Sequence, residues 1–129
     1  MVRILLADDE PDITTSIKKG LEHYGFEVDA FNDPVEALSK FKPNLYDLLL
    51  IDIRMPKMNG FELYREIRKK GDSKSIVCFI TAFEVYYDEF KKIFPDLDVK
   101  YFIRKPIKVA DLASKIKTML NGEVSKETP

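Results

Sequence analysis

The chain has 129 residues, of which 45% are hydrophobic and 33% are charged, and this composition is typical of one soluble globular domain. Its 21 basic and 22 acidic side chains nearly cancel. This balance argues against nucleic acid or an anionic membrane as a partner, without excluding a local basic patch. No apolar run approaches the roughly 20 residues of a membrane helix. With no visible signal peptide and one cysteine, Cys78, we expect a cytoplasmic protein.

Five short apolar runs are typical of β-strands. They are Val2–Ala7, Phe26–Phe31, Leu48–Ile51, Ile76–Ile80 and Val99–Ile103. Segments with apolar side chains at helical spacing follow each of them, at about residues 11–24, 34–42, 61–70, 86–94 and 112–120. Strands and helices that alternate in this way predict an α/β fold of the (βα)5 type, a doubly wound parallel sheet with helices on both faces.

Local signals support this pattern. Asp33 followed by Pro34 is a good helix start, because the aspartate can cap the first turn and proline suits the first helical position. Leu48–Ile51 is apolar on both faces, so we expect that strand at the centre of the sheet. We expect one domain over residues 1–121 and a polar C-terminal tail over residues 122–129.

Four of the five predicted strands end in a residue that can take part in chemistry. Asp8 and Asp9 follow the first strand, Asp52 the third, Thr81 the fourth and Lys105 the fifth. Each of these residues alone would suit a turn or a helix cap. In an open parallel sheet, however, the carboxyl ends of the strands share one edge, and ligands bind there. We therefore expect these side chains to form one site.

The residue types in this set suit phosphoryl transfer. Carboxylates about 4 Å apart repel each other by about 4 kcal/mol at an effective dielectric of 20, so a proton or a cation must neutralise them. Oxygen ligands favour Mg²⁺, whereas the only histidine, His23, and the only cysteine offer no zinc site. A carboxylate beside Mg²⁺ can attack a phosphoryl group, whose oxygens a lysine and a threonine can bind. The chain has no glycine-rich nucleotide-binding loop.

With these residues in this order, the chain resembles the receiver domains of response regulators in two-component signalling, the chemotaxis regulators among them. The resemblance runs from about Val2 to Leu120. It rests on Leu6-Ala7-Asp8-Asp9-Glu10-Pro11, Asp52-Ile53-Arg54-Met55-Pro56 with Asn59-Gly60, Ile80-Thr81-Ala82 and Lys105-Pro106. It implies a flavodoxin-like, three-layer α/β/α sandwich whose five-stranded sheet has the strand order 2-1-3-4-5.

The resemblance also implies a role for each matching residue. Asp52 would be the phosphoacceptor, phosphorylated by a histidine kinase. Mg²⁺ would be held by Asp9, by Asp52 and by the backbone carbonyl of Arg54, with Asp8 acting through a water molecule. The protein would then be a signalling switch, and it would catalyse only its own phosphorylation and dephosphorylation.

The remaining matches concern the switch itself. Lys105, in a cis peptide bond to Pro106, would contact the phosphoryl group, and Thr81 would supply the switch hydroxyl. Phe102 would be the switch aromatic, although its neighbour Tyr101 competes for that role. Strand alternation puts the two rings on opposite faces, so only one can lie behind the threonine. Phosphorylation would reshape the surface of the fourth helix, fifth strand and fifth helix, which an unknown output protein or domain would read.

The segment from Phe83 to Phe94 departs from the family pattern. It carries five aromatic side chains, and a Pro95-Asp96-Leu97-Asp98 turn replaces the usual small residues before the fifth strand. One hypothesis is that some of these rings face outward and form a partner or homodimer surface. A heavily packed core helix explains them equally well.

Two other functions compete with the signalling switch. A phosphatase of the haloacid-dehalogenase kind also uses an aspartyl nucleophile at a strand end, but it needs a second acid two residues later, where this chain has Arg54. A degenerate receiver that serves only as a binding module is the other alternative. Five intact residues argue against it, namely Asp8, Asp9, Asp52, Thr81 and Lys105.

Overall fold

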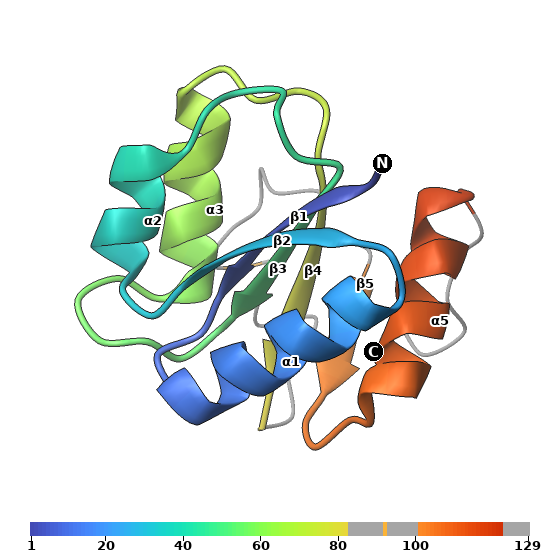
Figure 1. The fold of residues 1–129 in the computed structure, drawn as a ribbon. Coiled ribbons are helices and arrows are strands. Elements are labelled where there is room, and N and C mark those ends of the chain that lie inside the picture. Colours follow the sequence, from blue (N-terminus) through green and yellow to red (C-terminus); the bar gives the residue numbers. More distant parts are fainter. Residues whose placement is uncertain (83–91, 93–100, 123–129) are drawn as a thin grey trace.

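The computed structural model describes residues 1–82, 92 and 101–122, and within them the chain builds one parallel sheet. Its strands are β1 (Arg3–Ala7), β2 (Glu27–Phe31), β3 (Leu48–Asp52), β4 (Ile76–Thr81) and β5 (Tyr101–Arg104). All four strand pairs are parallel, and their order is β2-β1-β3-β4-β5 (Figure 1). The predicted fold class and strand order are confirmed.

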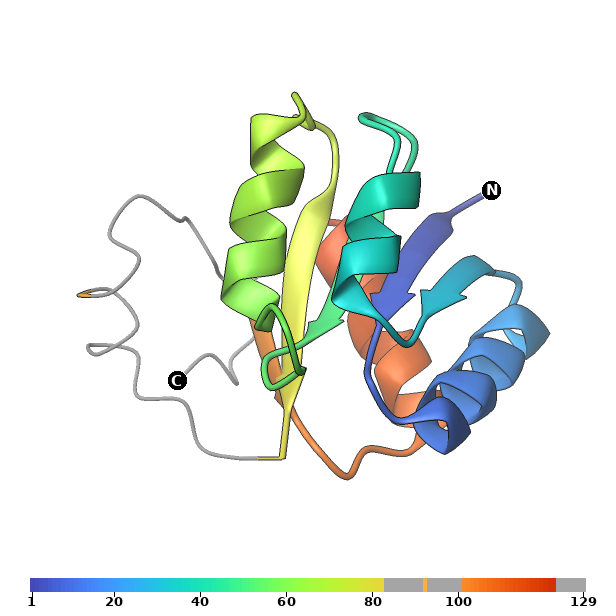
Figure 2. The same ribbon diagram turned by 90° about the vertical axis from the view of Figure 1, so that its left-hand side faces the viewer.

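Helices cover both faces of this sheet. The described helices are α1 (Pro11–His23), α2 (Pro34–Lys40), α3 (Gly60–Lys69) and α5 (Val109–Leu120). The helices α2 and α3 lie on one face, and α1 and α5 lie on the other (Figure 2). The helix predicted at residues 86–94 and the tail beyond residue 122 fall outside the described residues.

The helix starts follow from local hydrogen bonding. Asp33 caps α2 as predicted, because its carboxylate accepts a hydrogen bond from the backbone N–H of Val35 at 2.9 Å. At α3, Asn59 and Glu62 form a reciprocal capping box, each side chain accepting from the other's backbone N–H. Gly60 is therefore the first residue of α3, where the sequence pattern placed it just before the helix.

The sheet separates two hydrophobic cores, and β3 contributes to both. Its five residues are all buried, which confirms the predicted central strand. Leu49 and Ile51 face α2 and α3, whereas Leu48 and Leu50 face α1 and α5. A strand buried on both faces needs apolar side chains at every position, and this explains why its sequence shows no alternation.

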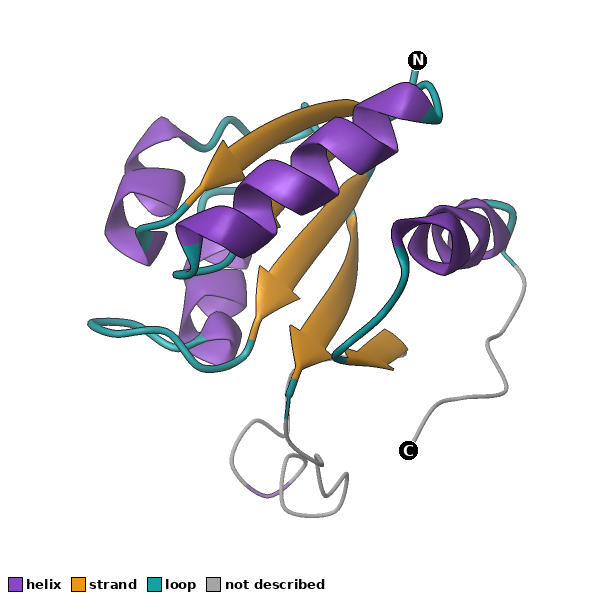
Figure 3. Ribbon diagram, turned by 60° about the horizontal axis from the view of Figure 1, so that its bottom comes forward, coloured by secondary structure: helices purple, strands orange, loops and turns teal. Residues whose placement is uncertain are grey.

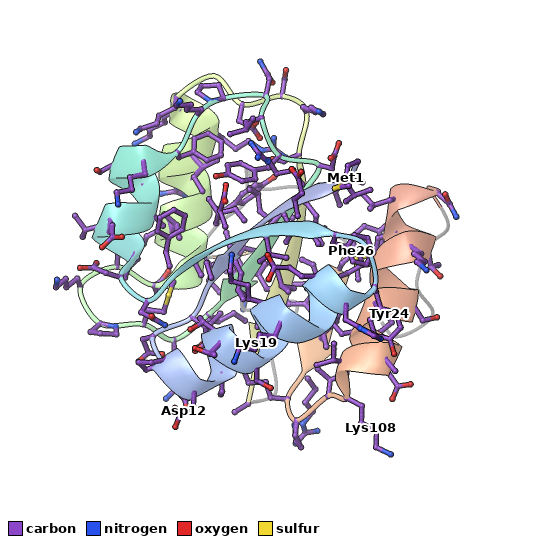
Figure 4. All side chains as sticks on the ribbon, in the orientation of Figure 1. Met1, Asp12, Lys19, Tyr24, Phe26 and Lys108 are labelled. Atoms are coloured by element: carbon purple, nitrogen blue, oxygen red, sulfur yellow. The ribbon has the colours of Figure 1, made fainter. Side chains whose placement is uncertain are left out.

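The carboxyl ends of the strands meet at one edge of the molecule, toward which their arrowheads point in Figure 3. Asp12 in the first turn of α1 and Lys108 at the start of α5 lie at this edge, and Met1 lies at the opposite end (Figure 4). The chain leaves β1 toward β2 on one side and returns to β3 on the other, which creates a switch point between β1 and β3. None of the helices in the described ranges combines the length and apolarity that crossing a membrane requires.

Candidate functional site

Four carboxylates gather at the switch point. Asp8, Asp9 and Glu10 follow β1, and their side chains each place a carboxylate oxygen within 4.8 Å of the other two. Asp52, the last residue of β3, lies next to this group and is only 6% exposed. Asp8 is fully buried, whereas Glu10 is exposed. The neighbouring parallel strands β1 and β3 thus bring their acidic ends together, as the sequence predicted.

Lys105 reaches into this acidic cluster from the end of β5. Its ammonium nitrogen lies 2.6 Å from a carboxylate oxygen of Asp8, 3.5 Å from one of Asp52 and 4.0 Å from one of Glu10. Burial lowers the pKa of Lys105, but the hydrogen bond to Asp8 and the surrounding negative charges outweigh burial and raise it above the usual value. The ammonium group is therefore a fixed positive charge within the cluster.

For the Asp52 carboxyl, burial outweighs the effect of the neighbouring positive charge, so its pKa is raised. Burial and the neighbouring charge of Asp8 raise the pKa of the Asp52 carboxyl from 3.8 to about 6. The charge of Lys105 and a hydrogen bond from the backbone of Arg54 partly offset this rise. One ammonium group does not neutralise all the carboxylates, so the site keeps a net negative charge that a bound cation would neutralise.

Backbone contacts hold Asp52 closely. The N–H of the next residue, Ile53, donates to the carbonyl of Ile80 in β4 at 3.1 Å, and the carbonyl of Ile53 accepts from the N–H of Gly60 at 2.8 Å. A Cβ atom on Gly60 would lie 2.4 Å from the carbonyl oxygen of Asp52. The start of α3 therefore packs directly against the backbone of Asp52, and only glycine allows this approach.

Thr81 and Lys105 come together as the strand-end argument predicted. Thr81 ends β4 and is buried, and its carbonyl accepts a hydrogen bond from the N–H of Lys105 at 2.7 Å. The peptide bond between Lys105 and Pro106 is cis, as the resemblance implied. Thr81 and Lys105 thus lie at the carboxyl ends of the neighbouring strands β4 and β5.

Phe102 and Tyr101 lie on opposite faces of the sheet, in agreement with strand alternation. Phe102 pairs with Phe79 in the parallel register, two residues before the pair of Thr81 with Arg104, so by alternation it shares a face with Thr81. Its ring centroid lies 5.8 Å from that of Phe79. Tyr101 belongs to the core on the α1 and α5 side.

Other predicted residues are also located by the fold. His23 is exposed at the end of α1, and Cys78 is buried in β4, where burial raises the pKa of its thiol. Arg54 follows Asp52 on the loop between β3 and α3, with its side chain exposed. The aromatic positions from Phe83 to Phe94 lie outside the described residues.

Sequence reasoning missed two contributors to the site. Glu10 stands in the motif string, and contiguity with Asp8 and Asp9 was the signal for its place among the carboxylates. Asn32, at the end of β2, donates hydrogen bonds to the carbonyl of Asp8 at 2.9 Å and to the hydroxyl of Thr14 at 2.7 Å. No spacing or motif pointed to Asn32, because strand β2 ends in no charged or nucleophilic residue.

Comparisons with known proteins show the family to which the chain belongs. The family model described as "Response regulator receiver domain" matches residues 4–117. The chain is 33% identical over 126 residues to the response regulator ArlR of Staphylococcus saprophyticus and 33% identical over 128 residues to the regulatory protein VanRB of Enterococcus faecalis. These matches cover 98% of this chain and 56% of each relative, so the chain spans about half the length of these relatives.

Solved structures give the same result. A CheY-like receiver domain protein from Methanospirillum hungatei has a TM-score of 0.79 and 30% identity, covering 95% of both chains. The response regulator TrrA from Thermotoga maritima, solved in complex with Mg²⁺–BeF, has a TM-score of 0.76 and 34% identity, covering 92% of this chain and 99% of that one. The chain therefore belongs to the response regulator receiver domain family, the phosphoacceptor domains of two-component signalling.

Proposed function

We propose that Asp52 is the residue that accepts the phosphoryl group, and that a histidine kinase is its physiological donor. The observation that carries the proposal is the position of Lys105, whose ammonium group lies between the carboxylates of Asp8 and Asp52 at the carboxyl edge of the sheet. A buried carboxylate beside a fixed cation is suited to attack phosphorus and to have the new negative charge stabilised.

The donor set fits a hard divalent cation. All of its side-chain ligands are carboxylate oxygens, and burial together with the negative charge of Asp8 raises the pKa of Asp52. Among the described residues, the Asp9 carboxylate has no hydrogen-bond or ion-pair partner, so it is available as a ligand. We assign Mg²⁺ to Asp9, Asp52 and the backbone carbonyl of Arg54, with Asp8 acting through water. When bound, Mg²⁺ would neutralise these carboxylates and share an oxygen of the phosphoryl group.

In the proposed reaction, an oxygen of the Asp52 carboxylate attacks the phosphorus atom of the donor. The new oxygen–phosphorus bond forms as the bond from phosphorus to the donor nitrogen of phosphohistidine breaks, and the leaving imidazole takes up a proton. Lys105 then pairs with a phosphoryl oxygen, and the hydroxyl of Thr81 donates a hydrogen bond to another. Hydrolysis of the resulting aspartyl phosphate returns the carboxylate. In this proposal the domain catalyses only its own phosphorylation and dephosphorylation, as a signalling phosphoacceptor rather than a general enzyme.

In this proposal, residues at the neighbouring strand ends transmit the effect of phosphorylation to the protein surface. We propose that Thr81 moves toward the phosphoryl group and that Phe102, on the same face of the sheet, follows it. This movement would change the surface formed by β5 and α5, where an output protein, an output domain or a second copy of the chain would bind. The single cysteine of the sequence, Cys78, is buried as a free thiol, which suits the reducing environment that we propose for a cytoplasmic protein.

Incubation with acetyl phosphate and Mg²⁺, followed by intact-mass analysis, tests the proposal. We expect the wild-type chain to gain the mass of one phosphoryl group, and we expect no gain with EDTA or in Asp52→Asn. A wild-type chain that gains no mass from acetyl phosphate or from a phosphorylated histidine kinase would overturn the proposal. Repeated turnover of phosphate esters would indicate the phosphatase alternative instead.

A further inference from the structure

The side chain of Asn32, the residue after β2, contacts both the acidic loop that follows β1 and the first turn of α1. Its amide nitrogen donates to the backbone carbonyl of Asp8 at 2.9 Å and to the hydroxyl oxygen of Thr14 at 2.7 Å. Both acceptors are buried, Asp8 fully and Thr14 to 3% exposure. Because a carbonyl oxygen can only accept, the amide must point its NH₂ group toward the loop.

The second of these bonds continues into α1. The hydroxyl of Thr14 accepts a hydrogen bond from Asn32 and donates one to the carbonyl of Pro11 at 3.0 Å. The two bonds therefore form a continuous chain from Asn32 to Pro11. The segment from Asp8 to Pro11, which contains the carboxylates of Asp8, Asp9 and Glu10, is therefore held at both of its ends by one hydrogen-bonded chain that starts at Asn32.

The corner that presents Asn32 is itself anchored. The next residue, Asp33, caps α2 through Val35, and its second carboxylate oxygen lies 2.9 Å from the ammonium group of Lys57. Lys57 belongs to the loop that follows Asp52, and its backbone has a positive φ of 72°. The β2–α2 corner thus contacts both loops that carry the acidic residues of the site.

We propose that Asn32 is a positioning residue, which holds the Asp8–Pro11 segment in the geometry that binds the divalent cation. The inference rests on the proposed phosphoacceptor function, since it assigns a role within the same site. Asn32 touches neither the cation nor the phosphoryl group in this role. It fixes the backbone of Asp8, and through Thr14 it fixes the path along which Asp9 and Glu10 present their oxygens.

Mg²⁺ affinity, measured by calorimetric titration of the full chain, tests this role. Partners that orient metal ligands typically contribute about 10- to 100-fold to metal affinity or activity, and Asn32 acts one step further out through the backbone. We therefore expect Asn32→Ala to weaken Mg²⁺ binding about 3- to 10-fold. At saturating Mg²⁺, the rate of phosphorylation by acetyl phosphate should recover most of its wild-type value.

Matched variants separate positioning from a loss of stability. Thr14→Val removes the hydroxyl and should weaken Mg²⁺ binding in the same direction, whereas Thr14→Ser keeps the hydroxyl and should retain the wild-type affinity. Tyr46→Phe removes a different hydrogen bond to β2, the 2.7 Å bond to Asp29, and lies outside the site. It should lower the melting temperature without changing Mg²⁺ affinity.

The outcomes distinguish the two proposals. If the wild type binds Mg²⁺ and is phosphorylated but Asn32→Ala binds Mg²⁺ equally tightly, the positioning role is wrong and the proposed function stands. If Tyr46→Phe weakens Mg²⁺ binding as much as Asn32→Ala does, the effect is one of general stability and the positioning role is again wrong. If the wild type neither binds Mg²⁺ nor accepts a phosphoryl group, both proposals fail together.

Discussion

The ammonium group of Lys105 lies 2.6 Å from the carboxylate of Asp8, although the two residues are 97 positions apart in the sequence. The contact joins the end of β5 to the end of β1, and it places a largely covered positive charge beside the buried carboxylates of Asp8 and Asp52.

Lys105→Ala should separate metal binding from chemistry. Loss of the ammonium group removes a cation that competes for the carboxylates, so Mg²⁺ should bind about 3-fold or more tightly. Phosphorylation should slow by about 10²- to 10³-fold, because a charge that stabilises the transferred group is missing. Calorimetric titration and mass-based rates measure the two effects. Lys108→Ala, which removes an exposed positive charge at the start of α5, is the matched control (Figure 4). Equal slowing in both variants would contradict a specific role for Lys105.

Asp52→Asn should stabilise the metal-free protein in a pH-dependent way. A carboxyl whose pKa is raised on folding, here from 3.8 to about 6, binds its proton more tightly in the folded state. The folded wild type therefore loses stability as the pH rises from about 4 to above 6. Asparagine cannot ionise and escapes this loss. A shift of about two units corresponds to at most about 3 kcal/mol, so we expect a gain of about 1 to 3 kcal/mol at pH 8.

Urea denaturation in EDTA at pH 4.5 and at pH 8 measures this difference. Asp12→Asn removes an exposed carboxylate from the same edge of the molecule and serves as the control for a simple change in net charge (Figure 4). A gain from Asp52→Asn that is as large at pH 4.5 as at pH 8 would show that burial and the charge of Asp8 do not act on Asp52 as described.

Gly60→Ala should lower the stability of the protein and displace the backbone of Asp52. The added methyl group would lie 2.4 Å from the carbonyl oxygen of Asp52, so the strand end and the start of α3 must move apart. Overpacking of this kind typically costs about 1 to 3 kcal/mol. Phosphorylation should also slow, because Asp52 is displaced. Ile67→Val in α3 provides a variant of comparable cost, about 0.5 to 1.5 kcal/mol, that leaves the site untouched. A Gly60→Ala chain with wild-type phosphorylation kinetics would contradict the close approach.

Cys78 should be inert in the native protein. Burial raises the pKa of its thiol, so little thiolate forms at neutral pH, and β4 is covered on both faces. Alkylation with iodoacetamide, followed by mass analysis, should label the chain slowly without denaturant and completely in concentrated urea. Rapid labelling under native conditions would show that β4 opens or that the thiol is accessible.

The sequence predicted most of the fold because its local signals agree with one another. Apolar runs, helix periodicity and the Asp33 cap each pointed to the same alternation, and the strand ends predicted where the carboxylates, Thr81 and Lys105 would meet. This works because parallel strands in an open sheet place their carboxyl ends at one edge whatever the loops do. The family resemblance supplied the strand order, which periodicity alone does not determine.

Sequence patterns do not predict the contacts of Asn32 and Lys57. Both residues sit in loops, and a loop's path depends on the packing of the elements it joins rather than on its own periodicity. The close approach of Gly60 to Asp52 likewise appears only once α3 is packed against β3. The sequence therefore predicted the residues of the candidate site, and the fold was needed to identify the residues that contact them from neighbouring loops and helices.

Chemical mapping of the phosphorylated position tests the central claim most directly. After reaction with acetyl phosphate and Mg²⁺, borohydride reduces an aspartyl phosphate to homoserine, which peptide mass spectrometry locates. We predict that homoserine appears at position 52 alone in the wild type, and at no position in Asp52→Asn. Homoserine at position 8 or 9, or undiminished labelling of Asp52→Asn, would contradict the assignment of Asp52 as the phosphoacceptor.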